Sequence, residues 1–206
     1  MQDNRRPITS RSKRWAMELA TLLINRDISP NQISVASIGF AAVAAASMAA
    51  STGILASLSA IVFIQLRLIC NLLDGMVAIE GGKQSTLGGL YNEFPDRIAD
   101  SLLIVALGYA AGDPSLGWFA ALAAALTAYV RVFGGSLGLK QTFAGPMAKQ
   151  HRMAVMTAGL ALNIPESLLF ATHNALYIAL IVIAAGSVVT CITRTRTTAR
   201  QLKEAQ

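Results

Sequence analysis

Carboxylate and amide side chains gather in two short stretches of a chain that is otherwise strongly apolar. These oxygen donors are Asn71, Asp74, Asn92, Glu93, Asp96 and Asp100. Ionisable groups inside a bilayer-length helix are costly and usually functional. Oxygen ligands without nearby His or Cys suit Mg²⁺ or Mn²⁺ rather than zinc, and Mg²⁺ typically bridges protein carboxylates and substrate phosphates. We therefore predict that these six residues surround a divalent metal.

Helical spacing predicts that the donors converge. At about 100° per residue, Asn92, Asp96 and Asp100 share one face, and Asn71 and Asp74 share a face of the preceding helix. Antiparallel packing across the short loop between the helices would bring both faces together. Four carboxylates crowded in a low-dielectric site would repel one another unless a cation lay among them. Arg67 lies on the face of Asp74, so a plain buried salt bridge between these two is the alternative.

The connecting loop, residues 80–89, supplies glycines, Lys83 and the hydroxyls of Ser85 and Thr86. Such a loop could wrap a diphosphate.

The elements that must position these residues are membrane helices. The 206 residues are 54% hydrophobic and 14% charged, whereas soluble proteins carry about 25% charged residues. Apolar stretches of bilayer length predict an all-α protein with six transmembrane helices at about 31–51, 54–79, 89–111, 115–137, 152–172 and 174–192. Residues 12–26 predict an amphipathic helix in the membrane interface, with Trp15, Leu19, Leu22 and Leu23 on its apolar face. Ser29 and Pro30 predict the start of the next helix.

We expect one membrane domain over residues 1–206, with a six-helix bundle at 31–192 and a cytoplasmic tail at 193–206. The net charge of +6 lies on one side of the predicted membrane, because the connections at 51–53, 112–114 and 163–173 carry no Lys or Arg. The positive-inside rule then places both termini and the polar cluster in the cytoplasm, at a bacterial-type inner membrane. Anionic lipid headgroups explain these charges better than nucleic acid does.

The polar cluster resembles the motif of the CDP-alcohol phosphotransferases. That family carries Asp-x2-Asp-Gly-x2-Ala-Arg-x8-Gly-x3-Asp-x3-Asp at the end of its second span and the start of its third. Here Asn71-x2-Asp74-Gly75-x2-Ala78-Ile79-x8-Gly88-x3-Asn92-x3-Asp96 has the same spacing without a gap. The resemblance extends to six spans, an interfacial N-terminal helix, Pro30-Asn31 and a Tyr-x-Arg at Tyr129 and Arg131.

Three motif positions depart from the family pattern, which marks a divergent subfamily. Two aspartates are replaced by Asn71 and Asn92, and the arginine is replaced by Ile79. Glu93 and Asp100 are additional carboxylates that could restore the charge. A second register is open, in which Asp96 and Asp100 are the closing pair of the motif.

The resemblance implies transfer of a phosphatidyl or other substituted phosphate group from a CDP-linked donor, expected to be CDP-diacylglycerol, to an alcohol, with release of CMP. By resemblance, the catalytic base is Asp96, or Asp100 in the second register. It also implies a homodimer in contact with membrane lipids. The implied nucleotide-binding residues are Gly75, Ala78, Lys83, Ser85 and Gly88. The implied acceptor-binding residues are Arg131, Lys149 and Arg152.

Two other functions compete with this interpretation. The substitutions at 71, 79 and 92 favour a degenerate relative that binds a CDP-lipid without catalysis. A cation or metabolite transporter would place its carboxylates near the bilayer centre and show some repeat symmetry. Here the carboxylates lie at helix ends and no repeat is visible.

Overall fold

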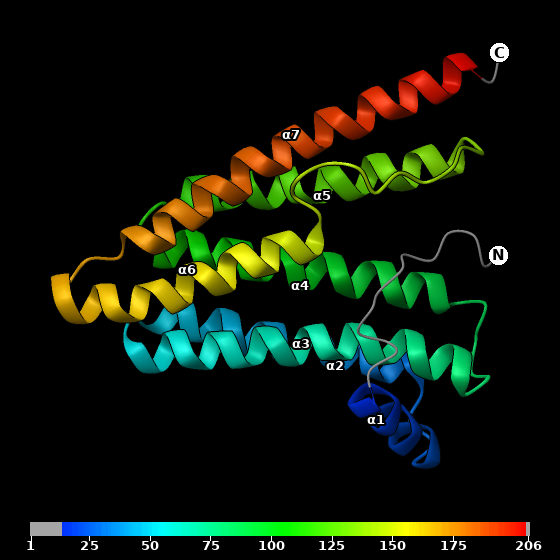
Figure 1. Cartoon of the computed structure of the whole chain (residues 1–206), viewed down its shortest axis with the longest axis horizontal. Coiled ribbons are helices and arrows are strands. Elements are labelled where there is room, and N and C mark those ends of the chain that lie inside the picture. The colour runs from blue at the N-terminus through cyan, green and yellow to red at the C-terminus, as the bar shows by residue number, and fades with distance from the viewer. Residues whose placement is uncertain (1–13, 205–206) are drawn as a thin grey trace.

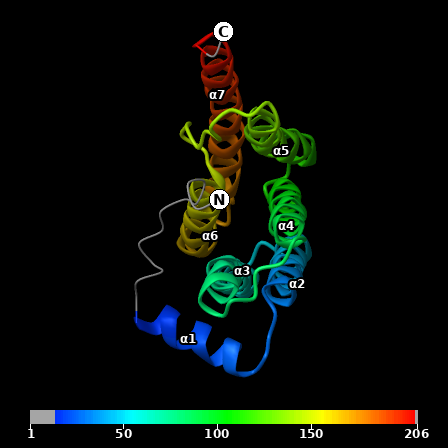
Figure 2. The same cartoon turned by 90° about the vertical axis from the view of Figure 1, so that its right-hand side faces the viewer.

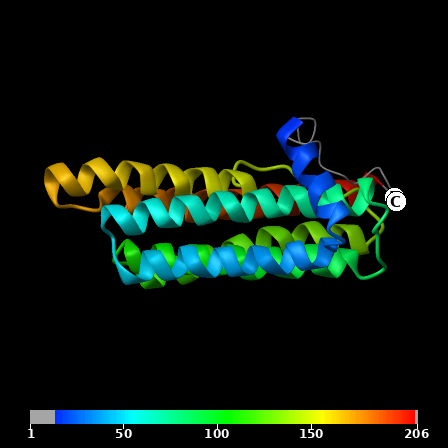
Figure 3. The ribbon, with the colours of Figure 1, turned by 90° about the horizontal axis from the view of Figure 1, so that it is seen from below.

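The computed structural model describes residues 14–204, and over that range every regular element is a helix. The helices are α1 (Arg14–Asn25), α2 (Pro30–Ala50), α3 (Ile54–Glu80), α4 (Gly88–Ala110), α5 (Pro114–Ser136), α6 (Lys149–Phe170) and α7 (Asn174–Glu204). Helices α2 to α7 run along one long axis, and the short α1 crosses them near one end (Figure 1, Figure 3). The all-α polytopic membrane architecture predicted from the sequence is confirmed.

Five helices are long and apolar enough to cross a membrane, namely α2, α3, α5, α6 and α7. Helix α4 has 23 residues and lies in the same bundle, but charged side chains occupy its first half. By composition, the predicted count of six spans is therefore not confirmed. Helix α4 is the one predicted span that is not apolar enough to count, because it carries most of the charged residues of the predicted site.

Helix α7 is longer than predicted. The apolar run ends near residue 192, yet the helix continues to Glu204 through most of the predicted tail. Thr198 is buried beside Gly134 of α5, and Arg194 donates hydrogen bonds to the carbonyl oxygens of Thr127 (2.6 Å) and Ala144 (3.0 Å). These contacts hold the polar end of the helix against α5, which hydropathy could not indicate.

Helix α2 supports both α3 and α4, the two helices that carry the residues of the motif. Its buried face is built from Ala41, Ala44 and Ala45, and small side chains let neighbouring backbones approach closely. Both α3 and α4 pack mainly on α2, as Figure 2 shows end-on. The backbones of α3 and α4 do not pack closely on each other, but side chains of the two helices meet directly, as the contacts of Asn71 and Arg67 with α4 show.

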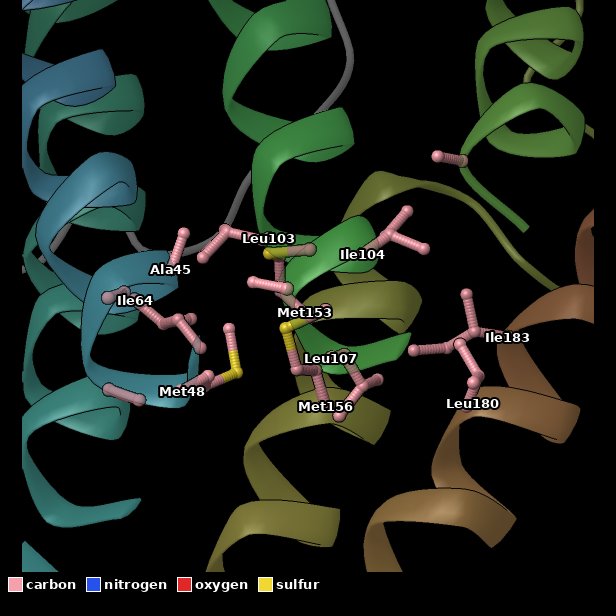
Figure 4. Packing of buried hydrophobic residues seen from close by; sticks show 14 of the residues in the cluster. Ala45, Met48, Ile64, Leu103, Ile104, Leu107, Met153, Met156, Leu180 and Ile183 are labelled. Atoms are coloured by element: carbon pink, nitrogen blue, oxygen red, sulfur yellow. The ribbon is translucent and has the colours of Figure 1, made fainter. Parts of the chain in front are cut away.

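The space between α3, α4 and α6 is filled by side chains. Figure 4 shows the apolar part, where Ile64 of α3, Leu103 and Leu107 of α4, and Met153 and Met156 of α6 converge. Closer to the end that α1 crosses, the same space is filled by the long polar side chains of Arg67 and Arg152.

Two local predictions at the start of the chain hold. Ser29 caps α2, because its Oγ accepts a hydrogen bond from the Gln32 amide (3.2 Å) and its own amide donates to the Gln32 side chain (2.9 Å). Helix α1 buries Ala16 and Ala20 against α3 and leaves Trp15 and Leu19 exposed. Residues 12–13 of the predicted interfacial helix lie outside the described range.

Candidate active site

Asp96 of α4 lies at the centre of the polar cluster. The Asn71 Nδ2 of α3 donates to its Oδ1, and the Lys149 Nζ of α6 lies 2.5 Å from its Oδ2. The Arg67 Nη2 is 3.6 Å from Oδ1, and the Arg97 Nη2 is 3.9 Å from Oδ2. Three helices therefore meet at one buried carboxylate, as the sequence predicted for α3 and α4.

Asp100 lies one turn further along α4 and is held between two arginines. Its Oδ1 is 3.2 Å from the Arg67 Nη2, and its Oδ2 is 2.5 Å from the Arg152 Nη2. Arg67 is 0% exposed, Arg152 1% and Asp100 3%. Both oxygens of this carboxylate are thus already engaged by guanidinium groups.

Asp74 differs from Asp96 and Asp100 in that it accepts its hydrogen bonds from neutral groups. The Ser34 Oγ of α2 donates to its Oδ2 (2.7 Å), and the Gly75 amide donates to its Oδ1 (2.6 Å). The alternative pairing of Asp74 with Arg67 is wrong, because Arg67 reaches across to Asp96 and Asp100 instead. Ser34 was not predicted from the sequence; its only signal was a hydroxyl in the second turn of an apolar helix.

Glu93 is turned toward α5. Its Oε1 lies 2.5 Å from the Arg131 Nη2, while the Arg131 Nη1 donates to Gln141 (2.9 Å) and the guanidinium carbon lies 5.3 Å from the Phe143 ring centre. Arg131 therefore ties the start of α4 to the loop at residues 137–148. Its predicted acceptor contact would compete with these interactions.

The loop between α3 and α4 is tied to the turn after α1. The Lys83 Nζ donates to the Asp27 Oδ1 (2.6 Å), and the ammonium lowers the pKa of the Asp27 carboxyl. Ser85 is exposed and its carbonyl accepts a hydrogen bond from the Gly88 amide (3.0 Å). Gly75 and Ala78 are half-buried on α3, one and two turns beyond Asn71.

Ion pairs balance most of the carboxylates, so the prediction that only a metal could do so is corrected. Arg67, Arg131, Lys149 and Arg152 neutralise Glu93, Asp96 and Asp100. Within residues 14–204, no three His, Cys, Asp or Glu side chains form a group that could hold an ion. The six predicted metal ligands are therefore not gathered around a single point.

A smaller set of donors does fit a divalent cation. Asn71 Oδ1 is buried and has no hydrogen-bond partner among the described residues, and it belongs to the side chain that contacts Asp96. Asp74 forms no ion pair in the described range, and Asp96 supplies a second carboxylate, whose partner Lys149 lies at the edge of the site. Asn92 is exposed on α4, four residues before Asp96. Oxygen donors of this kind suit Mg²⁺ or Mn²⁺.

A groove of about 410 Å³ opens beside Asn71 and Lys149. It runs between α3 and α6 under Trp15 of α1. The remaining lining residues are Gln65, Leu68, Ile69, Leu72 and Gln150. A groove with both apolar and polar lining residues thus opens beside Asn71 and Lys149, the two contacts of Asp96.

Comparison with known proteins supports the same interpretation. The chain is 34% identical over 152 residues to the archaetidylinositol phosphate synthase of Aeropyrum pernix, covering 73% of this chain and 76% of that enzyme. The chain belongs to the CDP-alcohol phosphotransferase family. This relationship confirms the resemblance drawn from the motif, although no protein-family model matches the chain.

Solved structures share the fold of this CDP-alcohol phosphotransferase. The crystal structure of Mycobacterium tuberculosis phosphatidylinositol phosphate synthase with CDP-DAG bound has a TM-score of 0.75 at 17% identity, over 90% of this chain and 94% of that one. The same synthase in complex with manganese and citrate has a TM-score of 0.73 at 17% identity, over 89% and 88%. Enzymes of this family transfer a substituted phosphate group from a CDP-linked donor to an alcohol in phospholipid synthesis.

Proposed function

We propose that this enzyme transfers a phosphatidyl-type group from a CDP-linked lipid, such as CDP-diacylglycerol, to a phosphorylated inositol and releases CMP. The observation that carries the proposal is the meeting of α3, α4 and α6 at Asp96, beside a groove with an apolar wall. The relative from Aeropyrum pernix is named for an inositol phosphate product, which makes this acceptor the first to test.

Asp96 is the proposed general base, in preference to Asp100. Its partners Asn71 and Lys149 line the groove, so a bound alcohol can approach its carboxylate. Asp100 lies deeper, and arginines occupy both of its oxygens. In the proposed step, the acceptor oxygen bonds to the donor phosphorus, the bond from phosphorus to CMP breaks, and Asp96 takes the hydroxyl proton.

Asn71, Asp74 and Asp96, with Asn92 four residues before Asp96, are the proposed holders of Mg²⁺ or Mn²⁺. When bound, such an ion supplies positive charge to the donor diphosphate. Lys149 is 22% exposed at the groove and is the cation best placed for a substrate phosphate. Arg131 stays a proposed acceptor residue, in which case the substrate displaces Glu93 from it. Arg152 is not proposed for the acceptor, because its guanidinium is buried against Asp100.

Gly75, Ala78, Lys83, Ser85 and Gly88 are the proposed nucleotide-binding set. They extend from the α3 end of the site along the loop to α4. The groove under Trp15 is proposed to take the lipid part of the donor, because Leu68, Ile69 and Leu72 give it an apolar wall. We propose that this end of the bundle lies in the cytoplasm, because the basic residues of the chain are one-sided.

A degenerate CDP-lipid-binding protein is the second candidate. The substitutions at Asn71, Ile79 and Asn92 favour it, because they remove two acids and one cation from the family motif. A binding protein would hold the CDP-lipid through the same residues but would not release CMP.

The test uses the purified full chain in lipid nanodiscs with Mg²⁺ or Mn²⁺, CDP-diacylglycerol and inositol phosphate. We expect CMP release together with a new phospholipid, both measured by mass spectrometry. Asp96→Asn should lose about 10²–10⁴-fold in rate, whereas Asp113→Asn should not, because Asp113 caps α5 at the other end of the bundle and Asn caps equally well. Donor binding without CMP release, under conditions where a family enzyme turns over, would favour the degenerate protein.

A further inference from the structure

Three charged residues from three helices meet one helical turn beyond Asp96 along α4. Arg67 comes from α3, Asp100 from α4 and Arg152 from α6, and at most 3% of each is exposed. We call these residues the Arg67–Asp100–Arg152 cluster. Neither the general base nor the proposed metal ligands belong to it.

The cluster links α4 to α3 and α6, two helices on which its backbone does not pack closely. Helices α3 and α4 both rest on α2, and α6 packs on α3 and α7. Asn71 and Asp74 are therefore carried by α3, and Asp96 by a helix whose backbone does not pack closely on α3. Among polar contacts in the described range, Arg67 to Asp100 (3.2 Å) and Arg152 to Asp100 (2.5 Å) link α4 to both α3 and α6.

Arg67 also contacts the base itself. Its Nη2 lies 3.5 Å from the carbonyl oxygen of Asp96 and 3.6 Å from Asp96 Oδ1. Its Nε and Nη1 have no hydrogen-bond partner within residues 14–204. Since a buried guanidinium needs a compensating anion, the position of Arg67 depends on Asp100.

Arg152 is anchored in the same way. Its Nη1 donates to the carbonyl oxygen of Met147 (2.8 Å) and its Nη2 to Asp100. This places the first turn of α6, and hence Lys149, beside Asp96. One carboxylate thus fixes two arginines, and each arginine fixes a different wall of the site.

We propose that Asp100 is a positioning residue: it holds Arg67 against Asp96 and Arg152 beneath Lys149, and so sets the spacing between the two halves of the motif. Asp100 takes no proton from the acceptor. This inference rests on the proposed function for its kinetic consequence, but its structural part stands independently. It also gives the extra carboxylate of this chain a role other than metal binding.

The proposal predicts rescue by a second substitution. Asp100→Asn leaves two buried guanidinium groups with one fewer anion, so it should be damaging. Adding Arg152→Gln removes one excess cation and gives the new amide at position 100 a neutral hydrogen-bond partner. The double variant should therefore be less impaired than Asp100→Asn alone, which would not follow if Asp100 were a reacting group.

The experiment measures both stability and kinetics for the wild type, Asp100→Asn, Arg152→Gln and the double variant, with Asp113→Asn as the matched control. The unfolding midpoint in detergent should fall in Asp100→Asn and recover in the double variant. The kcat of Asp100→Asn should fall by about 10²-fold, the scale of a misplacement near 1 Å. The KM for the donor should change less than twofold, and the double variant should regain at least tenfold in kcat.

Two results would overturn the proposal. One is a double variant no more stable or active than Asp100→Asn, and the other is an Asp100→Asn protein with unchanged midpoint and kcat. If the wild type releases no CMP, the proposed function fails instead, and the pattern of unfolding midpoints alone decides the role of Asp100.

Discussion

At the level of single residues, Asn71 is the position where this chain departs most informatively from the family motif. An amide replaces a carboxylate, yet its oxygen is buried and without a partner in the described range. Its side-chain nitrogen meanwhile donates to Asp96. An oxygen placed in this way can ligate a cation but adds no charge, so the affinity for the ion should be weaker than a third carboxylate would give.

The first prediction follows from this arrangement. Chelation by EDTA should abolish CMP release, and Mg²⁺ or Mn²⁺ should restore it. Asn71→Ala should raise the metal concentration needed for half-maximal rate by about tenfold or more, the scale seen when metal-site partners are removed. Asn25→Ala, at the exposed end of α1, is the matched control. An unchanged metal requirement in Asn71→Ala would remove this residue from the metal site.

Lys149 is the second residue whose role can be tested alone. It pairs with Asp96 at 2.5 Å and lines the groove, so it can exchange one anion for another. Lys149→Gln should raise the KM for a phosphorylated acceptor by about 10- to 100-fold, the equivalent of one hydrogen bond to a charged group. The KM for the CDP-linked donor should change much less.

Lys140→Gln serves as the control, since Lys140 is exposed in the loop before α6. Equal effects of Lys149→Gln on the KM values of donor and acceptor would contradict a specific role in acceptor binding.

At the level of elements, helix positions were readily predicted because burial in lipid and burial in protein favour the same apolar side chains. The six long predicted segments correspond to α2–α7. Helix α2 also begins where the sequence predicted, with Ser29 as its N-cap and Pro30 as its first residue. The end of α7 was missed because Thr198 and Arg194 are polar. They are buried by tertiary contacts with α5 and its following loop, which a hydropathy pattern does not contain.

The site was predicted less completely than the fold. Helical spacing correctly brought Asn71 and Asp96 together, since that geometry depends only on residues within two helices and one loop. It could not show that Arg152, 52 residues from Asp100, supplies the counter-charge. The expectation that a metal alone offsets all the carboxylates was wrong for this reason: Arg131, Lys149 and Arg152, which pair with Glu93, Asp96 and Asp100, are distant in sequence.

Helix packing yields a third prediction. Gly108 of α4 and Gly117 of α5 meet so closely that a Cβ on Gly108 would lie 2.6 Å from the Gly117 Cα. Gly108→Ala should therefore cost about 1–3 kcal/mol of stability, as overpacking does, and lower the unfolding midpoint in detergent. Gly39→Ala in α2 is the control, because a Cβ there would meet nothing within 4 Å. A Gly108→Ala protein as stable as Gly39→Ala would show that the two helices can separate without cost.

At the level of the whole molecule, the two ends of the bundle differ in character. The end crossed by α1 carries the cluster around Asp96, the loop with Lys83 and the C-terminal end of α7 (Figure 1). The opposite end has the short connections after α2, α4 and α6. There His173 lies 2.8 Å from the Asn163 Oδ1 of α6 and 2.9 Å from the Thr52 Oγ1, so it ties the connections after α2 and α6 to helix α6.

The charge distribution predicts how this bundle is oriented. Lys and Arg side chains gather at the end with the polar cluster, and such residues are retained in the cytoplasm during insertion. In a protein with Cys70 and Cys191 replaced by Ala, Thr172→Cys should react with a membrane-impermeant thiol reagent added to intact cells. Gln84→Cys should react only after the cells are opened. Both side chains are exposed in the structure, so their difference reports the side of the membrane. The reverse pattern would place the site on the outer face, away from cytoplasmic nucleotides, and would contradict the use of a CDP-linked donor.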